Sequence, residues 1–168
     1  PHPPRNFSSA ASDVYKRQEV DYIVRHEKRN NFIKNMTLDL KGNTLVLFQY
    51  VEKHGKELFE IIRKGAEKDR KVFYVSGEVD AKDREQIRGI VESQKNAIIV
   101  ASLGTFSTGI NIKNLHNIVF ASPSKSQRKV LQSIGRGLRQ SDDGSNTTLY
   151  DIADDMHIKS HKNFTLRH

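Results

Sequence analysis

The sequence contains no cysteine, which excludes disulfide bonds and any metal site built on thiolates. It also lacks a run of about 18 or more apolar residues, the length that a membrane-spanning helix needs. Hydrophobic residues make up 36% of the 168 residues and charged residues 29%, a balance typical of a globular domain with a modest core. We therefore expect one domain, without membrane association, from a reducing compartment.

The chain is strongly basic, with 28 lysines and arginines against 20 acidic residues and a net charge of +8. A basic surface of this size attracts polyanions, and nucleic acid is the first candidate. Basic balance also serves solubility alone, so the charge indicates a class of partner without naming a function.

The first residues of the chain do not read as native protein. Ser8–Gln18 resembles the in-frame translation of a sequencing-library adapter, and the prolines at positions 1, 3 and 4 oppose regular structure. We expect residues 1–18 to be such a scar and to be disordered, which makes the chain a fragment of a longer protein. The expected organisation continues with a connecting segment over 19–42, the main domain over 43–156 and a polar tail over 157–168.

Strand-like and helix-like segments alternate from position 43 onward. Short apolar runs predict five strands, at 43–50, 71–75, 97–101, 117–120 and 147–150. Apolar residues at helical spacing predict helices at 30–39, 54–68 and 80–93, and Ser124–Gln127 has the pattern of a capping box that opens another. This alternation indicates an α/β fold, a three-layer α/β/α sandwich around a mainly parallel sheet.

Polar loops follow the apolar strands of this sheet. Ser76, Ser102 and Pro123 each come shortly after a strand, and right-handed crossovers place such loops at one edge, where ligands bind. The loop over 101–111 is rich in hydroxyl groups and glycines, which suit contact with a phosphate backbone or a ribose. Taken alone, a loop of this composition is also typical of an ordinary turn.

The stretch Gln132–Arg139 reads Gln-Ser-Ile-Gly-Arg-Gly-Leu-Arg. Its first arginine comes four residues after the glutamine, and its second comes three residues later. This spacing places the three side chains near one helix face. The two glycines each cost about 0.5–1 kcal/mol inside a helix, which indicates a close approach to a neighbouring surface or an early helix end. Arginine forks match phosphate oxygens, as a phosphoryl-transfer site requires where charge builds on the leaving γ-phosphate. The alternative is a solvated basic helix end with a glycine stop.

Together, these stretches resemble the C-terminal RecA-like domain of superfamily-two helicases and translocases. The family's motif six reads Gln-x-x-Gly-Arg-x-x-Arg, and its fixed positions are filled by Gln132, Gly135, Arg136 and Arg139. Motif five is matched by Ala101-Ser102 at a strand end and by Gly109-Ile110-Asn111. Ser102 keeps the hydroxyl of the family's threonine, whereas Asn111 loses the carboxylate of its aspartate.

A finer resemblance is to repair helicases encoded by phages. It is carried by Phe48–Gly55, by Tyr74–Gly77, by the turn Phe106–Gly109 and by the stretch from Asn114 to Lys125. This resemblance implies a role in phage DNA repair, recombination or replication, branched DNA as a substrate, and a location in the host cytoplasm.

The family resemblance implies that ATP and Mg²⁺ lie between two RecA-like domains, held mainly by a first domain that this sequence lacks. It implies that Arg136 and Arg139 reach the γ-phosphate, Arg139 as the arginine finger, and that Gln132 couples nucleotide state to the interface. The residues expected near the nucleotide are Gly109, Asn111 and Gly135. Those expected to bind nucleic acid are Gln49, Ser76, Ser102, Thr105 and Lys125.

The sequence has neither a Gly-x-x-x-x-Gly-Lys-Ser/Thr phosphate loop nor an Asp-Glu-x-His or Asp-Glu-x-Asp segment. We therefore expect the whole protein to be an ATP-dependent DNA helicase and this chain alone to be inactive. Two alternatives stay open: a non-catalytic basic nucleic-acid-binding module, and a translocase that moves on duplex without unwinding it. No metal site is expected, since His157 and His161 lack a third ligand.

Overall fold

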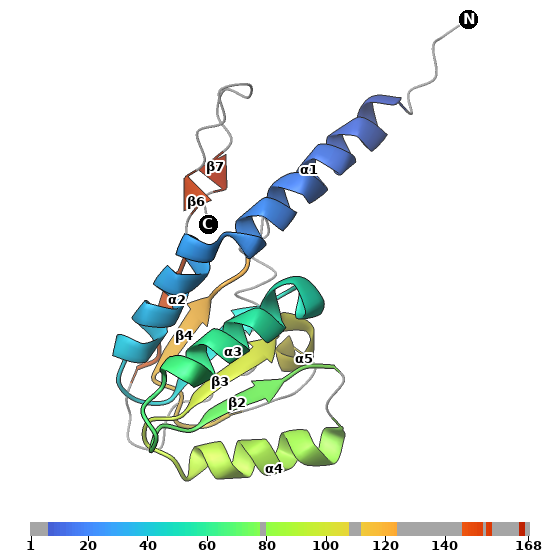
Figure 1. Ribbon diagram of the computed structural model, residues 1–168. Coiled ribbons are helices and arrows are strands. Elements are labelled where there is room, and N and C mark those ends of the chain that lie inside the picture. The colour runs from blue at the N-terminus through green and yellow to red at the C-terminus, as the bar shows by residue number, and fades with distance from the viewer. Residues whose placement is uncertain are drawn as a thin grey trace, which may run out of the picture.

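Five parallel strands form the sheet at the centre of the computed structural model, which describes residues 7–77, 80–107, 112–123, 146–152, 154–155 and 165–166 (Figure 1). Their order across the sheet is β2-β3-β1-β4-β5. The bounds are β1 Thr44–Phe48, β2 Val72–Val75, β3 Ile98–Ser102, β4 Asn117–Phe120 and β5 Thr148–Asp151. Each predicted strand is therefore present, and the predicted parallel sheet is confirmed.

The three central strands, β1, β3 and β4, are buried along their whole length. This explains their continuous apolar runs, because strands of a parallel sheet are covered on both faces. In the register, Leu45 of β1 lies between Ile99 of β3 and Ile118 of β4. β5 lies at the sheet's edge and is more open, with Leu149 42% exposed.

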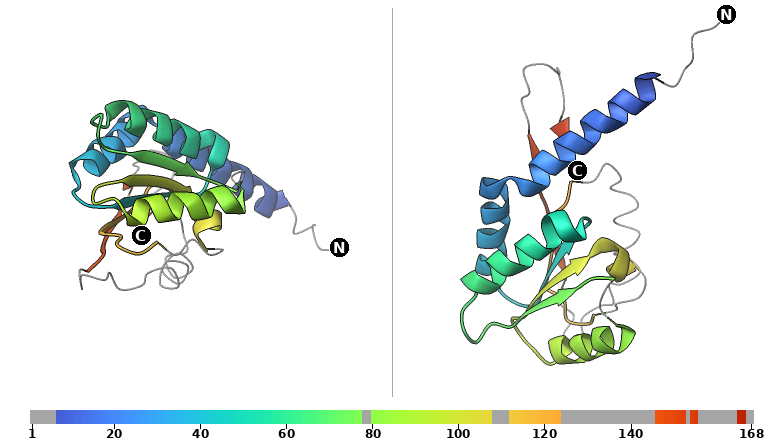
Figure 2. Two further views of the ribbon diagram at one scale, coloured as in Figure 1. Left: turned by 90° about the horizontal axis from the view of Figure 1, so that it is seen from below. Right: turned by 45° about the vertical axis from the view of Figure 1, so that its right-hand side comes forward.

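Helices cover both faces of the sheet, as the view from below in Figure 2 shows. The helices are α1 Phe7–Arg25, α2 Glu27–Asp39, α3 Lys56–Gly65, α4 Ala81–Glu92 and α5 Leu103–Ser107. On one face, Val46 and Phe48 pack with side chains of α2 and α3, including Ile33, Leu58 and Ile62. On the other, Leu45 and Leu47 pack with Val91 of α4 and Phe106 of α5. The alternation of side chains along β1 thus builds the predicted three-layer sandwich.

The helix α1 begins at Phe7, within the stretch expected to be an adapter scar, and projects away from the sheet (Figure 1). The prolines lie at positions 1, 3 and 4, before the helix, while Ala10, Ala11 and Lys16 are among the better helix formers. The end of α1 buries Ile23 and Val24. No helix in the described ranges is long and apolar enough to cross a membrane.

The segment expected to connect into the domain also packs within it. Ile33 of α2 is fully buried against the α3 face of the core. The helix begins after His26, whose ring Nδ1 accepts a hydrogen bond from the Arg29 N–H at 3.4 Å. The helix predicted at 30–39 is therefore confirmed, and it belongs to one layer of the sandwich.

Two other predicted helices differ in detail from the structure. The helix expected from His54 is preceded by a π-helical turn, η1 Val51–Gly55, in which the Gly55 N–H reaches back to Tyr50 O at 2.9 Å. Asp80 occupies the N-cap position of α4, as predicted, but its side chain makes no capping hydrogen bond to the described part of that helix. The helix predicted from Ser124 lies outside the described residues.

After β5 the chain forms a short antiparallel pair, β6 Asp154–Asp155 within the predicted domain and β7 Thr165–Leu166 within the predicted tail. No structure was predicted for this part of the sequence. Its two strands carry four residues in total, too few for an apolar period to stand out.

A buried asparagine organises the amino-terminal edge of the sheet. Asn43, fully buried before β1, donates through Nδ2 to Gln94 O at 2.8 Å and to Asn114 O at 3.2 Å. Its Oδ1 accepts the Ala97 N–H at 2.9 Å. One side chain therefore joins the segments that lead into three neighbouring strands.

A buried arginine does similar work nearby. The guanidinium of Arg70 donates to Leu38 O at 2.7 Å, to Leu40 O at 2.8 Å and to Asn96 O at 3.1 Å. Burial lowers the pKa of Arg70 from its usual value, with Glu67 opposing that shift. The contacts tie the end of α2 to the segment before β3.

Candidate functional site at the carboxyl edge of the sheet

The parallel strands bring their following loops to a single edge. Phe48 at the end of β1 is paired with Ser102 at the end of β3, and Val75 of β2 with Ala101. Gln49 and Ser76, the next residues along the chain, therefore lie at the same edge as Ser102. The prediction that these loops share one edge is confirmed for the described residues.

Ser102 and Thr105 form a hydroxyl pair that shapes the turn after β3. Their oxygens lie 2.6 Å apart, and Ser102 Oγ accepts the Thr105 N–H at 3.2 Å, as an N-cap does. Both side chains are almost wholly buried, at 7% and 5% exposure. Their hydroxyls hold the short helix α5 in place, and a contact to nucleic acid stays a prediction.

The remaining predicted nucleic-acid contacts differ in their exposure. Gln49 is exposed and follows β1, so its side chain faces solvent at this edge. Ser76 is fully buried, whereas Gly77 beside it is exposed. Of the two, Gln49 presents a side chain to a ligand.

The residues predicted to meet ATP lie outside the described parts of the structure. They are Gly109, Asn111, Gln132, Gly135, Arg136 and Arg139. Lys125, predicted to bind nucleic acid, and the His157 and His161 pair also fall outside them.

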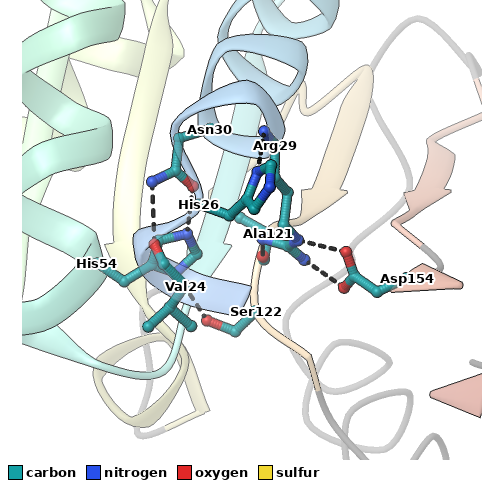
Figure 3. A network of polar contacts seen from close by, with 8 residues as sticks. All are labelled: Val24, His26, Arg29, Asn30, His54, Ala121, Ser122 and Asp154. Carbon is teal, nitrogen blue, oxygen red and sulfur yellow. Dashed lines mark hydrogen bonds and ion pairs between the residues drawn. The ribbon is translucent and has the colours of Figure 1, made fainter. Parts of the chain in front are cut away.

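A buried polar network that sequence reasoning missed lies beside this edge (Figure 3). His54, fully buried in η1, has Nδ1 3.2 Å from Ser122 Oγ and Nε2 3.2 Å from Asn30 Oδ1. Ser122 follows β4, and its Oγ accepts the Gln49 N–H at 2.8 Å. The network thus connects α2, η1 and the loops after β1 and β4.

Arg29 clamps the same region from α2. Its guanidinium donates to Ala121 O at 2.7 Å and pairs with both carboxylate oxygens of Asp154 in β6, at 2.6 and 2.9 Å (Figure 3). The two side chains are 7% and 13% exposed, so the pair is nearly dry. Such a bidentate pair fixes geometry as well as charge.

The partners in this network are far apart in sequence, which explains why no motif revealed them. His54 lies 24 residues from Asn30 and 68 from Ser122, and Arg29 lies 125 from Asp154. Burial, and secondly the positive charge of Arg29, lower the pKa of His54 from 6.5 to about 3. The imidazole is therefore neutral at physiological pH.

ATP and Mg²⁺ make different demands on the chain. Phosphate oxygens need N–H donors, which the sequence offers in Gln132, Arg136 and Arg139. Mg²⁺ needs a cluster of oxygen ligands, and the described residues contain no group of three histidine or acidic side chains that could hold a metal. The donor set therefore fits phosphate, and no described residues fit the metal.

A known protein family matches more than half of the chain. Residues 27–141 match the family described as "Helicase conserved C-terminal domain". The chain belongs to this family. The match starts at the first residue of α2 and runs past Arg139, so it includes the whole of motif six. The resemblance to superfamily-two C-terminal domains is confirmed.

Among curated proteins, this helicase domain is 36% identical over 178 residues to the ATP-dependent DNA helicase uvsW of Enterobacteria phage T4. The alignment covers 98% of the chain and 35% of the T4 protein, so the chain spans about a third of that relative. This confirms the finer resemblance to a phage helicase. The alignment reaches into the first eighteen residues, whose origin as an adapter scar stays a prediction.

Solved structures agree with this assignment. The crystal structure of T4 UvsW matches with a TM-score of 0.68 and 41% identity, over 81% of this chain and 28% of that one. The E. coli DEAD-box protein SrmB matches with a TM-score of 0.56 over 74% of this chain and 71% of that one. At 18% identity, SrmB shows the RecA-like helicase fold alone.

Proposed function

We propose that this helicase C-terminal domain is the second motor domain of an ATP-dependent DNA helicase that acts in phage DNA repair, recombination or replication. The observation that carries the proposal is the filled motif six, Gln132 to Arg139, in a chain of this family. Simple nucleic-acid binding does not need that spacing. The name of the T4 relative supports ATP and DNA as the ligands, and we include branched DNA among the substrates.

In this proposal the chain's arginines act across a cleft from a first motor domain. Bound ATP supplies the phosphoryl group, and the first domain supplies the phosphate loop and the ligands of Mg²⁺. Arg139 and Arg136 donate to the γ-phosphate oxygens, where negative charge grows in the transition state. Gln132 senses closure of the cleft, while Gly109, Asn111 and Gly135 allow close approach to the nucleotide.

The same edge grips the nucleic acid. Gln49 offers an exposed amide beside β1, and the Ser102–Thr105 pair holds the loop after β3 in shape. Lys125 completes the proposed set of side-chain contacts, whereas the side chain of Ser76 is fully buried. Opening and closing of the cleft then shifts this grip relative to that of the first domain, which converts hydrolysis into movement along the strand.

The test uses a first motor domain, supplied separately or by restoring the upstream reading frame. We expect DNA-stimulated ATP hydrolysis to fall about 10³–10⁵-fold in Arg139→Ala, because an arginine finger meets charge that exists only in the transition state. Arg63→Ala is the matched control, since Arg63 is a surface residue of α3 paired with Glu60. We expect this control to retain full turnover.

Three outcomes would redirect the proposal. ATP turnover by the chain alone, unaffected by Arg139→Ala, would contradict the division of labour between two domains. We call this chain together with a first motor domain the joined protein. Absence of turnover in the joined protein, together with salt-dependent DNA binding, would favour the basic binding module that the net charge of +8 allows. Turnover with movement along duplex but no strand separation would favour the translocase.

A further inference from the structure

The two ring nitrogens of His54 hold different elements of the domain. Nε2 faces Asn30 of α2, and Nδ1 faces Ser122 in the loop after β4 (Figure 3). Ser122 also accepts the Gln49 N–H from the loop after β1. A single imidazole therefore bridges the outer helical layer to two loops at the functional edge.

The direction of every hydrogen bond in this chain of contacts can be deduced. Asn30 Nδ2 donates to Val24 O at 2.9 Å, so Asn30 Oδ1 faces His54 and can only accept. Nε2 of His54 must then carry the proton. In a neutral ring Nδ1 is left as an acceptor, so the Ser122 hydroxyl donates to it while accepting from Gln49 N–H. The order runs from Gln49 through Ser122 and His54 to Asn30.

The hydrogen bonds from Gln49 through Ser122 and His54 to Asn30 form a relay. The two loops that this relay joins have different roles in the proposed motor. Gln49 is the exposed residue expected to contact nucleic acid. Ala121–Pro123 leads directly into the sequence that ends in motif six. Ala121 is held on both sides, because its N–H donates to Leu47 O at 2.9 Å and its carbonyl accepts from Arg29. The position of Ser122 relative to Gln49 thus depends on one further link, the imidazole.

We propose that His54 is a positioning residue that couples the nucleic-acid loop after β1 to the loop after β4, which precedes motif six in the sequence, and so supports the stimulation of ATP hydrolysis by DNA. This inference rests on the proposed function. His54 contacts neither ligand. It acts by holding Ser122 where the Gln49 backbone can bind it. Displacement of the loop after β1 would lower the rate of ATP turnover.

Two substitutions separate the two links. In His54→Asn the amide oxygen takes the place of Nδ1 and can still accept from Ser122, but the link to Asn30 is lost. In His54→Gln the longer side chain takes the place of Nε2 and can still donate to Asn30, but the link to Ser122 is lost. Both variants remove the same ring, so a purely structural role would affect them alike.

We expect His54→Gln to lower the DNA-stimulated kcat of the joined motor about tenfold to a hundredfold, with little change in the KM for ATP. We expect His54→Asn to keep most of that stimulation. Ser122→Ala removes this link and also the acceptor of the Gln49 N–H, so it should cause at least the same loss, and combining it with His54→Gln should add little to the loss from Ser122→Ala alone. The Ser122→Ala variant also tests the proposal if His54→Gln fails to fold.

The relay itself can be tested on the chain alone by the nitrogen chemical shifts of His54. We expect a protonated Nε2 and an unprotonated Nδ1, and the opposite tautomer would overturn the inference. Equal loss of stimulation in His54→Gln and His54→Asn would also overturn it, while leaving the proposed function intact. If Arg139→Ala has no effect on turnover, the proposed function fails and the inference fails with it.

Discussion

The two edges of the sheet are both held by buried polar side chains, but these side chains bind different kinds of partner. At the amino-terminal edge, Asn43 and Arg70 bind backbone carbonyls and one backbone N–H. At the carboxyl edge, the hydroxyls of Ser102 and Thr105 bind each other, and His54 binds Asn30 and Ser122. Asn43 and Arg70 thus bind main-chain groups alone, whereas the carboxyl edge combines bonds between side chains with main-chain bonds from Arg29, Ser102 and Ser122.

This difference separates stability from adjustment. A side chain that binds backbone groups leaves them unsatisfied when it is removed, and a buried unsatisfied group is costly. Pairs of side chains can exchange partners or take up a ligand with less disturbance of the main chain. We therefore expect substitutions at the amino-terminal edge to lower stability most, and those at the carboxyl edge to act more on function.

The largest expected effect on stability comes from Asn43→Ala at the amino-terminal edge. The change strands the Ala97 N–H and the carbonyls of Gln94 and Asn114, so we expect the free energy of unfolding to fall by about 4 kcal/mol. Urea unfolding measures the loss. Asn35→Ala, an exposed position in α2, is the control and should change stability by less than about 0.5 kcal/mol. A loss as small as that in Asn43→Ala would break the comparison between the edges.

The second prediction concerns pH and His54. Its pKa is about 3 in the folded protein against an ordinary value of 6.5, so the unfolded chain binds the proton more readily. Stability from this group is complete above pH 6.5 and falls as the pH drops toward 3. We expect a loss of about 3 kcal/mol between pH 7 and pH 4.

Unfolding is measured against pH for the unsubstituted protein and for His54→Asn. The comparison separates the contribution of His54 from that of the other titratable groups. The charged groups around the ring are Arg29 from α2, Glu57 from α3 through Asn30, and Asp154 from β6 through Arg29. Since His54→Asn retains these groups and removes the imidazole, the difference between the two curves reports the imidazole. Parallel curves would show that His54 is not buried as a neutral ring.

Two glycines provide the third prediction. A Cβ on Gly55 of η1 would lie 2.3 Å from the Phe48 ring, whereas a Cβ on Gly89 of α4 meets nothing within 4 Å. We expect Gly55→Ala to destabilise the domain by about 2 kcal/mol, because the rigid, buried Phe48 cannot move aside. Gly89→Ala should instead stabilise it by about 0.5–1 kcal/mol, as alanine does in a helix interior. Thermal unfolding of both variants tests the pair, and equal shifts would contradict this packing.

The smallest expected loss of stability is at the N-cap of α5. Ser102→Ala removes the acceptor of the Thr105 N–H and one half of the hydroxyl pair, which we expect to cost about 1 kcal/mol in unfolding free energy. The free energy of DNA binding by the joined protein should change by more than the free energy of unfolding does. A stability loss as large as that of Asn43→Ala would remove the distinction between the edges.

Local patterns in the sequence predicted much of the fold because its strands are short apolar runs with clear breaks. Leu45 to Phe48 and Ile98 to Ala101 are continuous apolar runs that suit strands covered on both faces, and the structure has them so. The spacing of Gln132, Arg136 and Arg139, taken together with the stretches that follow the strands, indicated the family, which the match over 27–141 confirms. Local order and motif spacing are the information that a sequence carries most directly.

The polar networks could not be predicted, because they depend on contacts between distant residues. Nothing near Asn43 indicates that its amide will meet Gln94, Ala97 and Asn114. Nothing in the apolar spacing from position 54 to 68 indicates the π-helical turn that turns His54 inward. Helix α1 was missed for another reason, since its resemblance to an adapter removed it from fold reasoning.

The place of β1 in the sheet has a mechanical consequence. It is bonded along its length to β3 on one side and to β4 on the other. A force on the loop after β1, such as bound nucleic acid would exert on a motor, loads the hydrogen bonds to β3 and to β4 at once and in shear. Rupture in shear requires many hydrogen bonds to fail together, whereas a strand at the rim can be peeled off one bond at a time. The loop that carries Gln49 therefore follows a strand that is held on both sides and can bear force.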